Sequence, residues 1–134
     1  MLRVFVLVFP VFILAGCGQP GDGEQVRFVF PDGDPTAGRT AFTEMQCYAC
    51  HAVEGDDFPD PHASPPVPVA LGPEVASMDR GYLAESIISP SHRIPEDMEG
   101  IRHEELSRMG DYSEAMTVRQ LIDIVAYLES LAGR

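Results

Sequence analysis

The chain has 134 residues and a formal net charge of −12 at pH 7, with 21 acidic and 9 basic residues, and every basic residue is an arginine. This length suits one domain with one modest core, so a second catalytic domain is not expected. The acidic balance argues against nucleic acid as a partner, because phosphate binding needs a basic surface.

Residues 1–16 have the composition of an export signal. Arg3 precedes the apolar run 4–14, which has the length of a signal-peptide core and is too short to span a bilayer comfortably. A buried core helix is the alternative interpretation. The run ends in Leu-Ala-Gly-Cys at 14–17, which resembles a bacterial lipobox. The resemblance implies cleavage before Cys17, lipidation of Cys17, and a protein anchored to a membrane on its periplasmic or extracytoplasmic side.

Residues 17–33 then form a predicted lipidated N-terminus and tether, rich in Gly, Pro and Asp. The loosely alternating segment 26–30 could lie extended against the domain that follows. We expect that domain to span residues 34–134.

A first helix is predicted from Pro35 to about Cys47. Asp34 is a suitable N-cap, Pro35 suits the first helical position, and Ala37, Ala41, Phe42 and Met45 recur at helical spacing.

The segment Cys47-Tyr48-Ala49-Cys50-His51 carries the clearest chemistry in the chain. Two cysteines at this spacing followed by histidine are typical of covalent haem c attachment, with two thioethers and His51 as the proximal iron ligand. Half of a zinc site or a redox-active dithiol are the alternatives. A zinc site needs a second ligand pair, a redox-active dithiol of this type lies in a βαβ pattern, and neither is found in the sequence.

The remaining elements are predicted in chain order as a loop, a short helix and a long final helix. Five prolines between residues 59 and 68 argue against regular structure from 52 to 73. Asp79 can cap a helix that Pro90 ends, and a short helix around 103–108 is possible. Residues 117–120 form a capping box before an apolar stripe that runs to Gly133. No strand pattern is strong, so the predicted class is all-α.

Four motifs lie in a characteristic order. Gly38 and Phe42 precede the haem motif as GxxxF, Leu-Gly-Pro stands at 71–73, Met-Gly-Asp-Tyr at 109–112, and the final helix contains DIVAYL at 123–128. In this order they resemble the class I c-type cytochrome family over roughly residues 34–132. The resemblance implies three to five helices wrapped around one covalently bound haem, with the first and last helices crossing where Gly38 is small enough to admit Ile124 and Tyr127.

The same resemblance assigns further residues around the haem. It implies that the carbonyl of Pro73 accepts a hydrogen bond from the His51 ring, and that Met109 is the sixth ligand of the iron. Gly110 replaces the proline that the family usually has after this methionine. Met116 is the main rival, although it matches a residue that packs under the haem edge. The other candidates as ligands are Met98, His62, His92 and His103, and the candidates as partners of a haem propionate are Arg80 and Arg93.

These residues predict a single-electron carrier with His/Met ligation rather than an enzyme with a small-molecule substrate. The alternatives are a haem subunit of a periplasmic oxidoreductase complex, and a haem sensor or peroxidase with an open iron site. The acidic runs at 54–60 and 96–105 are interpreted as solvated surface, so the redox partners should offer a basic docking patch.

Overall fold

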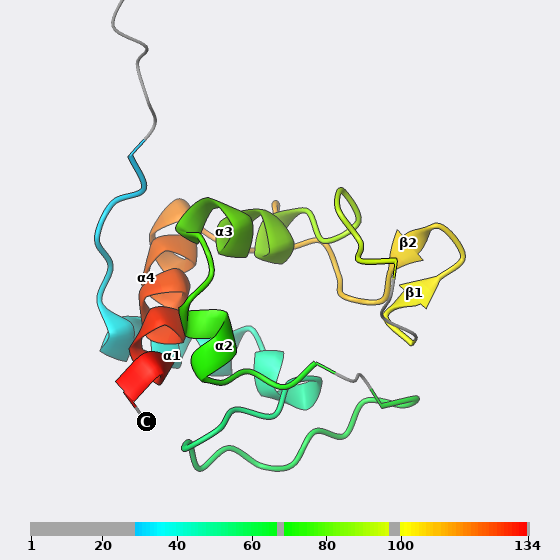
Figure 1. The fold of residues 1–134 in the computed structure, drawn as a ribbon, viewed down its shortest axis with the longest axis horizontal. Coiled ribbons are helices and arrows are strands. Elements are labelled where there is room, and N and C mark those ends of the chain that lie inside the picture. The colour runs from blue at the N-terminus through cyan, green and yellow to red at the C-terminus, as the bar shows by residue number, and fades with distance from the viewer. Residues whose placement is uncertain (1–28, 67–68, 97–99, 134) are drawn as a thin grey trace, which may run out of the picture.

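The computed structural model describes residues 29–66, 69–96 and 100–133. Within these residues it contains four α-helices, two short 3₁₀ helices and one hairpin (Figure 1). The elements are α1 (Pro35–Glu44), η1 (Cys47–Ala49), α2 (Pro73–Ala76), α3 (Arg80–Ile88), β1 (Arg102–His103), β2 (Leu106–Ser107), α4 (Val118–Glu129) and η2 (Ser130–Gly133). The predicted all-α class is therefore confirmed, with the hairpin as its one β element in the described part.

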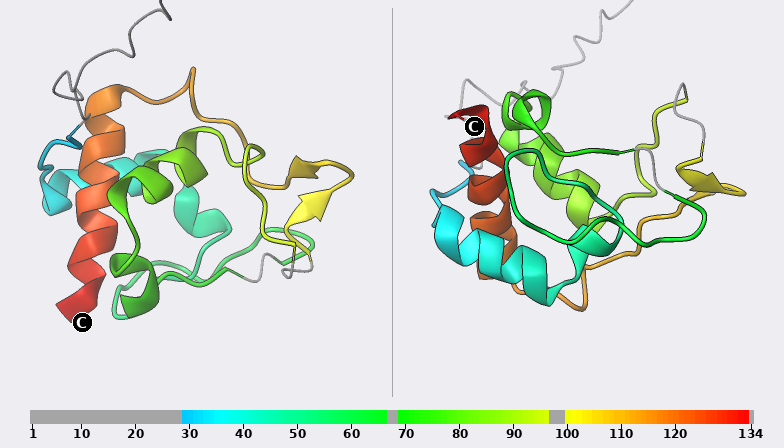
Figure 2. Two further views of the ribbon diagram at one scale, coloured as in Figure 1. Left: turned by 45° about the horizontal axis from the view of Figure 1, so that its top comes forward. Right: turned by 90° about the horizontal axis from the view of Figure 1, so that it is seen from below.

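The core is built where α1 crosses α4, as Figure 2 shows for the cyan and red helices. A Cβ placed on Gly38 would lie 1.9 Å from the carbonyl oxygen of Asp123 and 2.8 Å from the Cβ of Tyr127. Only glycine permits this approach, so the predicted crossing at Gly38 is confirmed. Ile124 and Tyr127 are 2% and 0% exposed at the crossing.

Both crossing helices begin at side-chain caps. The Asp34 carboxylate accepts hydrogen bonds from the backbone N–H groups of Thr36 and Ala37, and Asp34's own N–H donates to the buried Asp123 carboxylate at 2.9 Å. Thr117 and Gln120 form the predicted capping box of α4. The caps satisfy N–H groups that a helix start would otherwise leave unpaired.

Residues 29–33 pack on the domain although they precede the expected start at residue 34. Phe30 contacts the core. A Cβ on Gly33 would lie 2.5 Å from the carbonyl oxygen of Ile122, so the chain runs directly against α4. The predicted export signal, Cys17 and most of the tether lie outside the described residues. Of the helices in the described part, none has the length and apolarity that a membrane crossing requires.

Two predicted elements have different boundaries or a different form. The first helix ends at Glu44 rather than Cys47, because Gln46 adopts a left-handed conformation with φ of 57° and η1 follows. The short helix expected around 103–108 is wrong. That segment forms the β1–β2 hairpin, in which Arg102 pairs with Ser107 and Glu104 takes φ of 57° in the turn. The hairpin lies away from the α1–α4 crossing (Figure 1).

Candidate cofactor site

A cavity of about 280 Å³ lies between the helices and the loops that join them. Its wall includes Cys47, Cys50 and His51, together with Met109 from the loop before α4. Apolar side chains from α1, α3 and α4 complete it, among them Phe42, Leu83, Ile124 and Leu128. Three residues predicted from the haem motif and one predicted as a distal ligand therefore line one space.

The turn at η1 brings the two cysteines and His51 together. The N–H groups of Cys50 and His51 both donate to the carbonyl of Cys47, at 3.1 and 3.0 Å. Both cysteines carry free thiols. Before any covalent attachment, burial raises the pKa of the Cys47 thiol to about 11.

His51 is oriented by a backbone carbonyl. Its Nδ1 lies 2.9 Å from the carbonyl oxygen of Val69. When Nδ1 carries the proton and donates to this carbonyl, Nε2 is the ring nitrogen left for a metal.

The prediction that Pro73 supplies this carbonyl is therefore wrong. Residues 52–54 and 71 are joined by a bridge, in which Leu71 N–H donates to the Ala52 carbonyl and Glu54 N–H donates to the Leu71 carbonyl, both at 2.8 Å. This pairing places Val69 beside His51. Pro73 instead begins α2, where its fixed φ suits the first helical position.

A family model described as Cytochrome c matches residues 35–132. The chain belongs to the cytochrome c family. The match includes all four main helices, so the predicted cytochrome c fold is confirmed. No individual curated protein matches the chain.

Membership of the cytochrome c family means that the domain is a haem-based electron carrier, and it implies covalent haem c attachment in the region of Cys47 and Cys50. The residues present fit this group. Both thiols are free, His51 has one ring nitrogen occupied by Val69, and all three side chains line a largely apolar cavity. Cys47 and Cys50 would hold the haem vinyl carbons and His51 the iron.

Three methionines line the cavity, namely Met78, Met109 and Met116. Met78 is 41% exposed, whereas Met109 and Met116 are half-buried and pack against the core. Met98 lies outside the described residues. The N–H of Met109 donates to the hydroxyl of Ser107 at 3.1 Å, so the backbone of this residue has a defined place.

Tyr112 also lines the cavity close to the two cysteines. Burial raises the pKa of its hydroxyl, and the nearby thiols raise it further when they are ionised. The aromatic residue that follows the predicted ligand therefore faces the haem-attachment turn.

Of the two arginines weighed as propionate partners, only Arg93 lines the cavity. Arg80 is paired elsewhere, because its guanidinium donates to Glu129 at 2.7 Å and to Asp32 at 2.9 Å. Arg80 thus ties α3 to α4 and to the segment before α1, and of the two candidates it is the one that does not line the cavity.

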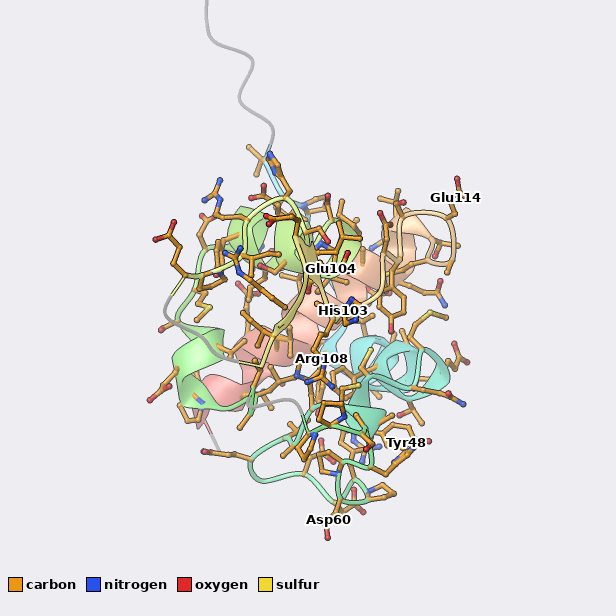
Figure 3. The ribbon with its side chains drawn as sticks, turned by 90° about the vertical axis from the view of Figure 1, so that its right-hand side faces the viewer. Tyr48, Asp60, His103, Glu104, Arg108 and Glu114 are labelled. Atoms are coloured by element: carbon orange, nitrogen blue, oxygen red, sulfur yellow. The ribbon has the colours of Figure 1, made fainter. Side chains whose placement is uncertain are left out.

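None of the three other histidines lines the cavity. The His62 ring lies beside Tyr48, with 6.4 Å between ring centroids, and His92 contacts the carboxylate of Glu85. His103 lies in β1 and points to solvent on the face shown in Figure 3.

Sequence reasoning missed a partly buried ionic cluster made of Asp56, Arg39 and Tyr127. The Asp56 side chain is 3% exposed, although the run 54–60 was expected to be solvated. Arg39 Nη2 donates to Asp56 Oδ1 at 2.6 Å, and the Tyr127 hydroxyl donates to Oδ2 at 2.7 Å. The Arg39 hydrogen bond, followed by that of Tyr127, holds the pKa of Asp56 well below its usual range.

This cluster joins the loop after the haem motif to the α1–α4 crossing. Arg39 also lies over the Phe58 ring, 4.5 Å from its centroid, and Phe58 contacts the buried Phe42 with 5.4 Å between ring centroids. The only sequence signal was an arginine one residue after Gly38, which would place it beside the crossing.

Proposed function

We propose that this protein carries single electrons through one covalently attached haem c, with His51 and Met109 as axial ligands of the iron. The observation that carries the proposal is the single cavity whose wall contains both cysteines, His51 and Met109. The chain has one CxxCH segment, which supports one haem.

When bound, the haem supplies a one-electron iron couple whose potential a thioether ligand raises. The protein's residues hold the two ligands and keep water from the site. Val69 sets the orientation of His51, while Phe42, Ile124 and Leu128 supply an apolar wall. Because His51 and Met109 would both hold the iron, a carrier of this kind would leave no position for a small-molecule substrate.

Met109 is favoured over Met78 and Met116 by the chain segments that carry them. Met78 lies just after α2. The segment that leads into α2 is bridged to the residues after His51, because Leu71 pairs with Val53. Met116 precedes the Thr117 cap and is fixed to the start of α4. Met109 belongs to the segment between β2 and α4, a separate part of the chain, which suits a ligand that closes over the haem.

Ferric and ferrous spectra test the ligand assignment. The ferric protein should show the weak long-wavelength sulfur-to-iron band. Met109→Ala should abolish this band, admit carbon monoxide to the ferrous iron and lower the midpoint potential, whereas Met116→Leu and Met78→Leu should leave all three unchanged. A band that survives in Met109→Ala and vanishes in either control assigns the ligand elsewhere.

We further propose that Cys17 is lipidated and that the domain works at the periplasmic or extracytoplasmic face of a membrane. The support is the apolar run and the lipobox-like residues 14–17. Mass spectrometry of the native protein should find a lipid on an N-terminal Cys17, and a Cys17→Ser chain exported by another route should be released from membranes with its haem spectrum intact. An unmodified Cys17 in the native protein would contradict this.

The redox partners are proposed to dock through a basic patch. The net charge of −12 favours such a partner by long-range attraction. Association should slow as salt is added, because salt screens exposed charges. Stopped-flow electron transfer that is insensitive to ionic strength would argue against an electrostatic encounter.

A further inference from the structure

Arg108, the residue before Met109, joins two loops that are far apart in the sequence. Its Nη1 donates to the carbonyls of Gly100 at 2.7 Å and Pro66 at 3.2 Å, and its Nη2 donates to the carbonyl of Pro65. In Figure 3 Arg108 lies between the hairpin above it and the loop that carries Asp60 below.

The loop after the haem motif is rich in proline over residues 59–66, and the carbonyls of this proline-rich loop suit an arginine as partner. Prolines have no N–H, so a segment rich in them cannot enter the regular pairing that satisfies backbone carbonyls. A guanidinium offers five N–H donors in one plane and can meet several carbonyls at once. A lysine carries the same charge on a single ammonium and lacks this planar set of donors.

Arg108 is also the last tie before the proposed ligand. The N–H of Arg108 donates to the Ile101 carbonyl at 2.8 Å, and Ser107 N–H donates to the Ser91 hydroxyl at 3.0 Å. After Met109 the packing is open, because a Cβ on Gly110 would meet no atom within 4 Å. Apart from the packing of its side chain against the core, the place of Met109 therefore depends on the contacts made just before it.

We propose that Arg108 is a positioning residue that latches the segment carrying Met109 to the proline-rich loop, and that this latch keeps the Met109 thioether on the iron. Arg108 and Met109 both line the haem cavity. The inference rests on the proposed ligation by Met109. The latch requires the planar set of N–H donors that arginine carries, and a positive charge alone is not enough.

The test compares Arg108→Lys and Arg108→Gln with matched changes at Arg102, all in the haem-loaded full chain. Arg102 lies in β1, in the hairpin that precedes Arg108. It is exposed, does not line the cavity, and within the described residues its side chain contacts one carbonyl, that of Ile94, at 2.9 Å. The measurements are the sulfur-to-iron band, the rate of carbon monoxide binding to the ferrous iron, and hydrogen exchange of the two loops and of α1 and α4.

Both Arg108 variants should weaken the sulfur band and bind carbon monoxide about tenfold faster. The loss of one charge-assisted hydrogen bond should raise the fraction of molecules in which Met109 is off the iron by about that factor. Exchange should quicken at residues 100–109 and 62–64. It should not change in α1 or α4, and that result would show that the fold persists. The Arg102 variants should match the wild type.

Two outcomes overturn the proposal in distinguishable ways. If the wild type shows the sulfur band and Arg108→Lys keeps it with unchanged carbon monoxide binding, the latch is wrong while Met109 ligation stands. If the wild type shows no sulfur band, the proposed ligation fails and the role of Arg108 in it fails too.

Discussion

The hydrogen bond from Tyr127 to Asp56 should contribute measurably to stability. The tyrosine is 0% exposed, and its hydroxyl donates to Asp56 Oδ2 at 2.7 Å. Tyr127→Phe keeps the ring, which contacts Phe42 with 5.5 Å between centroids, and removes only the hydroxyl. A hydrogen bond to a charged acceptor contributes about 1.5–3 kcal/mol. Asp56 keeps its bonds to Arg39, so we expect the lower part of this range, about 1.5–2 kcal/mol.

Urea unfolding of the haem-loaded protein, followed by far-ultraviolet circular dichroism, measures this loss. The midpoint should fall with an unchanged slope. Tyr48→Phe is the matched control, because the Tyr48 ring stacks on Phe58 while its hydroxyl makes no hydrogen bond among the described residues. It should change stability by less than about 0.5 kcal/mol. Equal effects of the two substitutions would refute the assignment of a buried charged hydrogen bond to Tyr127.

The same cluster predicts how stability depends on pH. The pKa of Asp56 is lowered in the folded protein, chiefly by Arg39. As pH falls, the Asp56 carboxylate is therefore protonated more readily in the unfolded chain than in the folded protein. The contribution of Asp56 is therefore fully present above the ordinary aspartate pKa of about 3.9 and is lost as pH falls below it. Asp56→Asn should be less stable at pH 7 and should lose less stability than the wild type between pH 5 and pH 3. Parallel pH profiles would contradict this.

Three further predictions concern the fold. Gly38→Ala should destabilise by about 3 kcal/mol or more, because its Cβ would overlap the Asp123 carbonyl, whereas Gly133→Ala, with no atom within 4 Å, should be nearly neutral in the same urea assay. Gly110→Ala should raise stability by about 0.4–1 kcal/mol, since the position is open and its φ is one that other residues adopt; a lower urea midpoint would argue against this. A chain with Cys47 and Cys50 both replaced by Ala should lack stable tertiary structure by near-ultraviolet circular dichroism, because a domain this small buries little apolar area without its haem. A well-ordered haem-free fold would refute the last expectation.

The parts of the fold that sequence predicted well are those set by neighbouring residues. Asp34 and Thr117 start helices through bonds to N–H groups two or three residues ahead, and the structure contains both caps. The haem motif is equally local, because Cys47, Cys50 and His51 lie within one turn. Such features follow from spacing alone.

The features that sequence missed depend on contacts between distant segments. Val69 rather than Pro73 faces His51 because residue 53 is bridged to residue 71, and no local pattern indicates that bridge. Asp56 lies in an acidic run and is buried only because Arg39 and Tyr127 meet it from two helices. The hairpin is a miss of another kind, because its pairing is local: Arg102 pairs with Ser107 and His103 with Leu106, although the side chains around 103–108 allow a helix.

Contacts made by three arginines give a structural reason for arginine, rather than lysine, at their positions. Arg39 holds the loop after the haem motif, Arg80 joins α3 to α4 and to the segment before α1, and Arg108 joins the hairpin loop to the proline-rich loop. In each case one guanidinium contacts two or more acceptors at once, which a lysine ammonium does less well because its donors share no fixed plane. A domain with long loops around one cofactor needs such cross-links where helices do not reach. The same three positions are therefore where an Arg-to-Lys exchange, neutral at most surface sites, should loosen the protein.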